Sequence, residues 1–337
     1  MKDINKKIND LISNLSDKQK TILSDRFGLN GNQLTLQKIG DGFGITRERV
    51  RQIESQSLKE LKSSFQEEFS DIVESAEKFL EKFDGAREDE YFINDIIHLN
   101  NIKPAKYIDN KVRFIFFVIG SPKLNSESKE LRAFWYREPK DKKNLINFIK
   151  DTIKFFKRQD KKKILEDKIH LDKLDSFKAH NHLYISKEFG TNVFGDFGLK
   201  SWPEVEPKVV KDKAYLVLRE KKQPLHFRDI AKSINDLGID KEKKMHVQTV
   251  HNELIKDKRF VLVGRGMYGL KEHGYEGGTV KEVITKLLKS NGPLDAKEVV
   301  ELVNEKKVLK ENTILLNLQN KKNFQRLEDG RYHIKTS

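Results

Sequence analysis

The sequence predicts a mainly α-helical protein built from several small modules, some of which carry a β-hairpin. Apolar residues recur at helical spacing along most of the 337 residues. Only 36% of the residues are apolar while 35% are charged, so the cores are expected to be small. A pattern of helices followed by paired strand-like segments also repeats in the second half of the chain. At about 100–200 residues per domain, the length predicts two or more domains.

Residues 1–70 are expected to form a helical module of their own. Apolar residues at helical spacing over residues 4–15 predict a first, amphipathic helix. Ser16 and Gln19 have the spacing of a capping box and begin a second helix, which the glycines of "FGLNG" end. Thr35 is suited to cap a short third helix with the sequence "LQKIGDGF".

A fourth helix is predicted to begin after a tight turn at Gly44, where the absence of a Cβ is useful. Thr46 is suited to its N-cap, and the helix is expected to run to about Lys62. Apolar and polar residues separate onto two sides of this helix. The polar side is densest in the first two turns, where it contains Arg47, Glu48, Arg51, Gln52 and Ser55. A short helix, a glycine turn and a longer helix with a polar beginning are the parts of a helix-turn-helix.

The polar residue types of the fourth helix suit a role in reading base pairs. In a helix-turn-helix, the beginning of the second helix enters the major groove of DNA. There, arginine can bond guanine, glutamate can accept from cytosine and glutamine can pair with adenine. Each good bidentate pair contributes about 1–3 kcal/mol of discrimination. An exposed helix stabilised by its own charge pairs would explain the same residue types equally well.

The stretch "LTLQKIGDGFGITRERVRQIESQSLKELK", with "RFGLNG" before it, resembles region four of the sigma-70 family of bacterial RNA polymerase sigma factors. The resemblance covers about residues 8–65. It implies a module that binds a promoter element and packs on the flap of the polymerase β subunit. Carried over by position, it implies base readers at Arg47, Glu48 and Gln52. The same resemblance implies that phosphate contacts or helix orientation depend on Thr35, Thr46, Arg49 and Arg51.

Two features distinguish this chain from the family pattern. Asp41 and Gly42 stand where the family usually has basic or helix-forming residues. Asp41 removes a phosphate contact, and Gly42 costs up to ~1 kcal/mol of helix propensity. In addition, no stretch resembles the sigma region that melts promoter DNA. The chain is therefore not expected to open promoters unaided.

The C-terminal half contains two similar units. "PLHFRDIAKSIN" from Pro224 corresponds to "PLDAKEVVELVN" from Pro293, and "FVLVGRGMYGLK" from Phe260 corresponds to "FQRLEDGRYHIK" from Phe324. Each unit reads as three helices followed by a β-hairpin, which is the order of a winged helix. The predicted modules are residues 204–275 and 276–337.

Two further winged-helix-like modules are expected before these. "NHLYISKEFGTNVFGDFGLK" from Asn181 aligns without gaps on "NELIKDKRFVLVGRGMYGLK" from Asn252, which predicts a module over residues 139–203. A weaker candidate spans residues 71–138 and ends in "VRFIFFVIG" and "LRAFWYRE". Within it, the apolar run at Phe114 is interpreted as a buried strand.

Residues from about 208 to 271 resemble the HARE-type helix-turn-helix. That family includes the N-terminal domain of the RNA polymerase delta subunit and modules attached to chromatin regulators and restriction enzymes. The resemblance implies that a helix from about residue 246 faces the groove and that Arg265, at the hairpin tip, reaches the minor groove or the backbone. The helix would offer Gln248, Thr249, His251, Asn252 and Lys256. A protein-docking role fits the module equally well. Because the chain ends in "RYHIKTS" without an acidic tail, delta-like strand displacement is not expected.

Charge and composition further limit the classes of partner and of site that this chain can have. A net charge of +14 favours a polyanionic partner, and nucleic acid more than a membrane surface. The absence of cysteine excludes disulfides, thiol catalysis and cysteine-ligated zinc. His180 and His182 lack a third ligand at zinc-like spacing, so neither a metal nor another cofactor is expected. "KFFKRQDKKK" is interpreted as a helix end with core phenylalanines, not as a platform for stacked bases.

These observations predict a non-enzymatic, cytoplasmic and nucleoid-associated transcription initiation factor without a membrane segment. Its expected partners are double-stranded promoter DNA, the RNA polymerase core through the β flap, and a complete sigma factor that it would redirect, assist or displace. One alternative is a delta-like polymerase subunit that binds little DNA itself. Another is the DNA-targeting subunit of a restriction or repair system.

Overall fold

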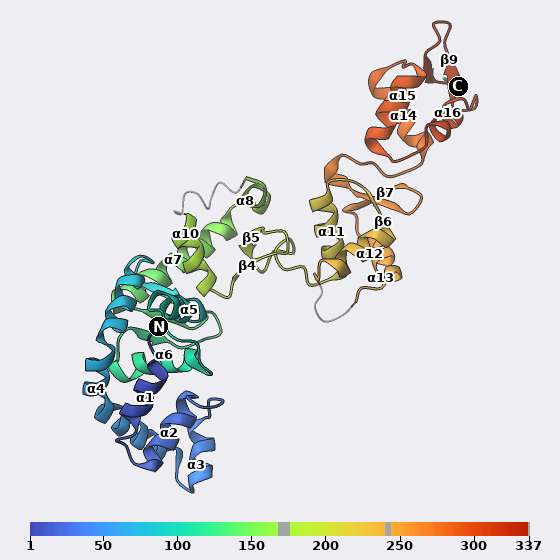
Figure 1. The fold of residues 1–337 in the computed structure, drawn as a ribbon. Helices are drawn as coiled ribbons and strands as arrows, with labels where there is room; N and C mark the ends of the chain where they lie inside the picture. Colours follow the sequence, from blue (N-terminus) through green and yellow to red (C-terminus); the bar gives the residue numbers. More distant parts are fainter. Residues whose placement is uncertain (168–175, 240–243, 336–337) are drawn as a thin grey trace. The chain divides into compact units, whose positions relative to one another are not determined.

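The computed structural model describes residues 1–167, 176–239 and 244–335. The described chain is mainly helical with small antiparallel strand pairs, as the sequence predicted, and two of these pairs gain a third strand (Figure 1). It divides into two compact units, Met1–Phe189 and Gly190–Ser337. The division falls inside the module expected over residues 139–203, so the module boundaries stay predictions.

The chain begins with four helices, and the starts of the second, third and fourth match the capping residues expected from the sequence. Ser16 forms a capping box with Gln19, and the hydroxyls of Thr35 and Thr46 accept hydrogen bonds from the third amide of their helices at 3.2 Å. The helices are α1 (Ile4–Ile12), α2 (Asp17–Phe27), α3 (Leu36–Phe43) and α4 (Arg47–Glu81).

The fourth helix is longer than predicted, because it ends at Glu81 and not near Lys62. Its first turns bury Val50 and Ile53 in a small core shared with α2 and α3. Its later turns continue to present apolar residues at helical spacing, from Leu61 to Leu80, and these belong to a larger core. The helix is therefore shared between the helix-turn-helix and the segment that follows it.

Residues 86–136 complete a second group of elements around the end of α4. In chain order these are β1 (Ala86–Glu88), α5 (Asp89–Leu99), α6 (Ile108–Ile119), β2 (Lys123–Asn125) and β3 (Phe134–Tyr136). The strands pair in the order β1-β3-β2. With the end of α4 as the first helix, the order is helix, strand, helix, helix, strand, strand.

The predicted strand at Phe114 is wrong, because the run "FIFFVIG" lies in α6 and the glycine that ends it. Seven residues of this helix are buried, on more than one of its faces. It packs against α4, α5 and α1. A short apolar run does not distinguish a buried strand from a helix that is covered on several sides.

The next segment contains the long helix α7 (Pro139–Arg158), followed by α8 (Lys161–Asp167), α10 (Ser176–Ile185), β4 (Phe189–Thr191) and β5 (Phe197–Leu199). The outer face of α7 is polar, and its opposite face buries Leu145, Ile149 and Phe156. The two strands pair with each other.

Within Gly190–Ser337, two groups of elements each contain three helices followed by a strand pair, the order that the sequence repeat predicted. The first has α11 (Val210–Lys221), β6 (Leu225–His226), α12 (Phe227–Asp236), α13 (Val247–Lys256), β7 (Phe260–Gly264), β8 (Met267–Leu270) and a 3-10 turn, η1 (Lys271–His273). The second has α14 (Val280–Asn291), α15 (Ala296–Lys306), α16 (Glu311–Leu318), β9 (Phe324–Arg326) and β10 (Tyr332–Ile334). Each encloses its own hydrophobic core. The sheet order β6-β8-β7 repeats the order β1-β3-β2 of the first unit.

Candidate nucleic-acid interface

The turn between α3 and α4 is held by close backbone contact. Gly44 has a φ of +65°, a conformation that glycine adopts without strain. The amide of Ile45 donates to the carbonyl oxygen of Gly40 at 3.0 Å. A Cβ on Gly40 would lie 2.6 Å from the carbonyl oxygen of Ile45, so no larger residue fits without movement. Sequence reasoning identified Gly44 but missed Gly40, whose only signal was a glycine inside a short helix.

The beginning of α4 presents a continuous polar surface to solvent. All seven residues assigned to this site by resemblance are exposed: Thr35, Thr46, Arg47, Glu48, Arg49, Arg51 and Gln52. The structure brings five of them together on the first two turns of α4, with Thr46 as its cap. We name the five, Arg47, Glu48, Arg49, Arg51 and Gln52, the reading arc.

Four of the five side chains of the reading arc contact one another in pairs along the helix. The Arg51 guanidinium holds the Glu48 carboxylate, with an Nη2–Oε1 distance of 2.6 Å and Nε distances of 3.0 and 3.1 Å. The Nη1 of Arg49 donates to the Oε1 of Gln52 at 3.1 Å. The hydrogen bond from Arg51 lowers the pKa of Glu48, and the reverse effect raises the pKa of Arg51. The carboxylate is therefore charged and oriented at neutral pH.

Asp41 lies close to the reading arc in the chain and is exposed on α3. Its carboxylate accepts a hydrogen bond from the Nε2 of Gln37 at 2.7 Å. Asp41 thus adds a negative charge to the first helix of the helix-turn-helix, where a phosphate contact would need a donor.

The third helix of the group around residues 86–136 is mostly buried. This helix is α6, and the Phe114 ring packs against Phe27 and Phe65 at centroid distances of 5.0 and 5.5 Å. Lys111, also buried, donates from Nζ to the Oδ1 of Asn5 at 2.5 Å. These aromatic and basic side chains are therefore occupied by contacts inside the protein.

In the second unit, α13 exposes four of the five residues expected to face a groove: Gln248, Thr249, Asn252 and Lys256. The Nε2 of Gln248 donates to the Oδ1 of Asn252 at 3.0 Å. Arg265 is exposed at the tip of the hairpin between β7 and β8. The structure thus leaves these five side chains available to a ligand.

His251 differs from its neighbours on α13. It is partly buried, and its ring stacks on Phe227 at a centroid distance of 4.4 Å and meets the edge of Tyr268 at 6.0 Å. The rotation of α13 turns this position toward α12 and β8, so His251 contributes to packing and lies apart from the exposed four.

The other sites weighed from sequence have structural explanations. His182 is buried, with Nε2 2.7 Å from the carbonyl oxygen of Phe83, whereas His180 is exposed. Residues 1–167, 176–239 and 244–335 contain no group of three or more potential metal ligands. Phe156 lies in the core, whereas Phe155 is 37% exposed. None of the described helices has the length and apolar character needed to cross a bilayer.

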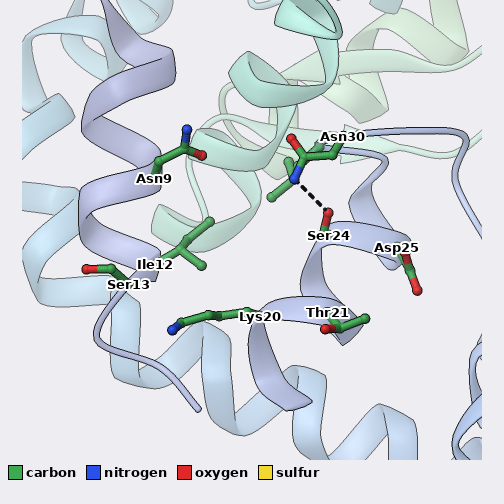
Figure 2. Close-up of a pocket in the computed structure, with 9 residues that line it drawn as sticks. Asn9, Ile12, Ser13, Lys20, Thr21, Ser24, Asp25 and Asn30 are labelled. Atoms are coloured by element: carbon green, nitrogen blue, oxygen red, sulfur yellow. Dashed lines mark hydrogen bonds between the residues drawn. The ribbon is translucent and has the colours of Figure 1, made fainter. Parts of the chain in front are cut away.

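A pocket of about 380 Å³ lies between α1 and α2 (Figure 2). Both polar and apolar side chains line it, and the Nδ2 of Asn30 donates to the Oγ of Ser24 at 3.2 Å. The lining residues are Asn9, Ile12, Ser13, Lys20, Thr21, Ser24, Asp25, Leu29 and Asn30. Its titratable members, Lys20 and Asp25, do not form a recognisable catalytic set.

Comparison with known proteins supports both helix-turn-helix modules. Residues 11–63 match the family described as sigma-70, region 4. Residues 208–273 match the HARE-HTH family, a helix-turn-helix domain whose description names ASXL and restriction endonuclease proteins. The chain is 40% identical over 60 residues to the RNA polymerase sigma factor SigA of Listeria monocytogenes, a similarity that covers 18% of this chain and 16% of the relative. This protein therefore combines a sigma-70 region 4 module with a HARE-type helix-turn-helix module in one chain.

Proposed function

We propose that this protein is a DNA-binding transcription initiation factor of sigma-like type that joins promoter DNA to RNA polymerase. The observation that carries the proposal is the reading arc: five polar side chains exposed together at the start of α4, in a sigma-70 region 4 module. The similar relative is an RNA polymerase sigma factor, which supports polymerase as the second partner.

In this proposal, Arg47, Glu48 and Gln52 read base edges in the major groove. Arg49 and Arg51 hold phosphates or orient the arc, as Thr35 and Thr46 do from the helix N-termini. The ion pair between Glu48 and Arg51 does not prevent reading, because an ionised carboxylate can accept about four hydrogen bonds. The Arg51 guanidinium occupies some of these positions and leaves others for a cytosine amino group.

The polymerase contact is proposed for the surfaces of α1 and α2 that α6 leaves uncovered. Phe27 of α2 packs against Phe114, so the apolar side of α2 that faces α6 is not available to the β flap. The remaining surface includes the pocket in Figure 2, which polar side chains line together with Ile12 and Leu29. A flap contact there would not compete with the reading arc.

The second unit is proposed to extend the DNA contact. Gln248, Thr249, Asn252 and Lys256 would face a groove while Arg265 reaches the adjacent backbone or minor groove. A complete sigma factor is the proposed source of promoter melting, with this protein redirecting, assisting or displacing it. The proposed location is the cytoplasm, in association with the nucleoid.

One observation favours a second candidate, a delta-like polymerase subunit with little DNA binding of its own. Asp41 places a carboxylate on the first helix of the helix-turn-helix, which weakens its attraction for phosphate. The HARE-type match also fits the targeting part of a restriction system. A nuclease that co-purifies with the chain would favour that reading.

Purification of the full chain from its native cell, with DNA crosslinked beforehand, separates these functions. The proposal expects core polymerase to co-elute and the crosslinked DNA to share a base pattern. Polymerase without enriched DNA would support the delta-like function. Absence of polymerase would refute the sigma-like proposal.

A further inference from the structure

The outer face of α7 is a row of positive charges that the proposed function does not use. The helix "PKDKKNLINFIKDTIKFFKR" contains seven lysines and arginines and two aspartates. Asp141 is buried, with its carboxylate 3.5 Å from the Nε of Arg137, so Asp151 is the carboxylate left on the outer face. We name the exposed cations of this face the α7 stripe: Lys140, Lys143, Lys150, Lys154, Lys157 and Arg158.

Most of the α7 stripe lacks an internal counter-charge. Among the described residues, Lys140 pairs with Glu138 at 2.9 Å and Lys154 with Asp151 at 3.6 Å. Both lysine side chains remain more than 65% exposed. The other four cations have no carboxylate within ion-pair distance in the described part of the chain. Like charges three or four residues apart destabilise a helix, so a polyanion bound along this face would stabilise it.

We propose that the α7 stripe binds the phosphate backbone of double-stranded DNA without reading its sequence. The inference rests on the proposed function, since it assumes that DNA is a partner of this chain. Lys140 and Arg158 are eighteen residues apart, which is roughly 27 Å along a helix. A duplex of that length carries about 16 phosphate charges. Lysine suits this role because it is a flexible point charge without base-reading geometry.

The composition of the stripe favours DNA over an acidic protein surface. The centres of protein interfaces are enriched in aromatic residues and depleted in lysine. The outer face of α7 is rich in lysine, and its one large exposed apolar side chain is Phe155, at 37%. It therefore lacks the apolar centre that a protein partner would need.

The test compares the full chain with the variant K143Q/K150Q/K154Q/K157Q on a duplex of random sequence over a series of salt concentrations. Glutamine keeps helix propensity close to that of lysine. Each lost phosphate contact should reduce the slope of log K against log salt by about 0.9, so a reduction of about 2–4 is expected. Affinity at low salt should fall by roughly 10- to 100-fold, while the preferred base pattern stays unchanged.

The matched control is K62Q/K78Q/K82Q/K123Q, which removes the same charge from exposed positions of the same unit. Its slope should change by less than about 1, because distant surface charges are screened. An equal reduction of the slope in both variants, or an unchanged slope in the α7 variant, would overturn the inference about the stripe but not the proposed function. If the α7 variant still bound DNA but no longer co-eluted with polymerase, the stripe would bind a protein partner, and the inference would also be overturned. A wild-type chain that binds no duplex would refute DNA binding by the protein as well.

Discussion

Two glycines of α3 provide a matched test of the helix-turn-helix geometry. A Cβ added to Gly40 would lie 2.6 Å from the carbonyl oxygen of Ile45 and 3.4 Å from the amide nitrogen of Arg47. A Cβ added to Gly42 would meet nothing within 4 Å. Both positions lie inside the helix, so alanine gains about 1 kcal/mol of helix propensity at each. At Gly40 that gain is opposed by an overpacking cost of about 1–3 kcal/mol.

We therefore expect Gly42→Ala to be more stable than the wild type by up to ~1 kcal/mol. Gly40→Ala should be less stable than Gly42→Ala by about 1–3 kcal/mol. Thermal unfolding of the full chain measures the difference, at about 2–4 °C per kcal/mol for a unit of this size.

Binding to duplex DNA gives a second measurement for the variants Gly40→Ala and Gly42→Ala. Relief of the Gly40 contact must move Ile45 and the start of α4, so we expect Gly40→Ala to weaken binding to a preferred DNA site. Gly42→Ala should bind at least as well as the wild type. Equal stability and equal DNA affinity of the two variants would show that backbone contact at this turn does not set the position of the reading arc.

Three further predictions concern side chains of the first unit. Arg47→Ala should lose about 1–3 kcal/mol on a preferred site and relax one base position in a binding-site selection; uniform weakening would make Arg47 a phosphate contact. Arg51→Gln should raise the pKa of Glu48 toward its ordinary value, as followed by NMR titration. Because the folded pKa of Glu48 is lowered, its pairing stabilises the fold above the unfolded pKa and is lost as pH falls through the folded value. Phe114→Ala should cost about 3–5 kcal/mol in chemical denaturation, since its ring is fully buried; a cost under about 1 kcal/mol would contradict the shared core.

Local signals predicted the starts of helices well. Ser16, Thr35 and Thr46 were identified as caps from residue type and spacing, and each accepts the expected hydrogen bond. These bonds join residues close in the chain, so they depend little on the rest of the fold. The repeated motifs likewise predicted three helices and a hairpin in each half of the second unit.

Features that depend on distant contacts were not predictable in the same way. The buried run at Phe114 was predicted to be a strand from its apolar residues alone. Its partners, Phe27 and Phe65, come from helices far away in the sequence, so the local pattern could not show that the run is a helix covered on several sides. The orientation of His251 depends on the rotation of α13 over Phe227, which residue spacing alone does not determine. The contact at Gly40 depends on how closely two backbones approach.

The 35-residue α4 has a consequence for how this chain can change over time. Because one uninterrupted helix serves two cores, no spacer near Lys62 can absorb an added or deleted residue. A single insertion there would rotate everything beyond it by about 100° and shift it by about 1.5 Å along the axis. Descendants of this protein can exchange side chains on α4, but they must keep the number of residues between its two cores.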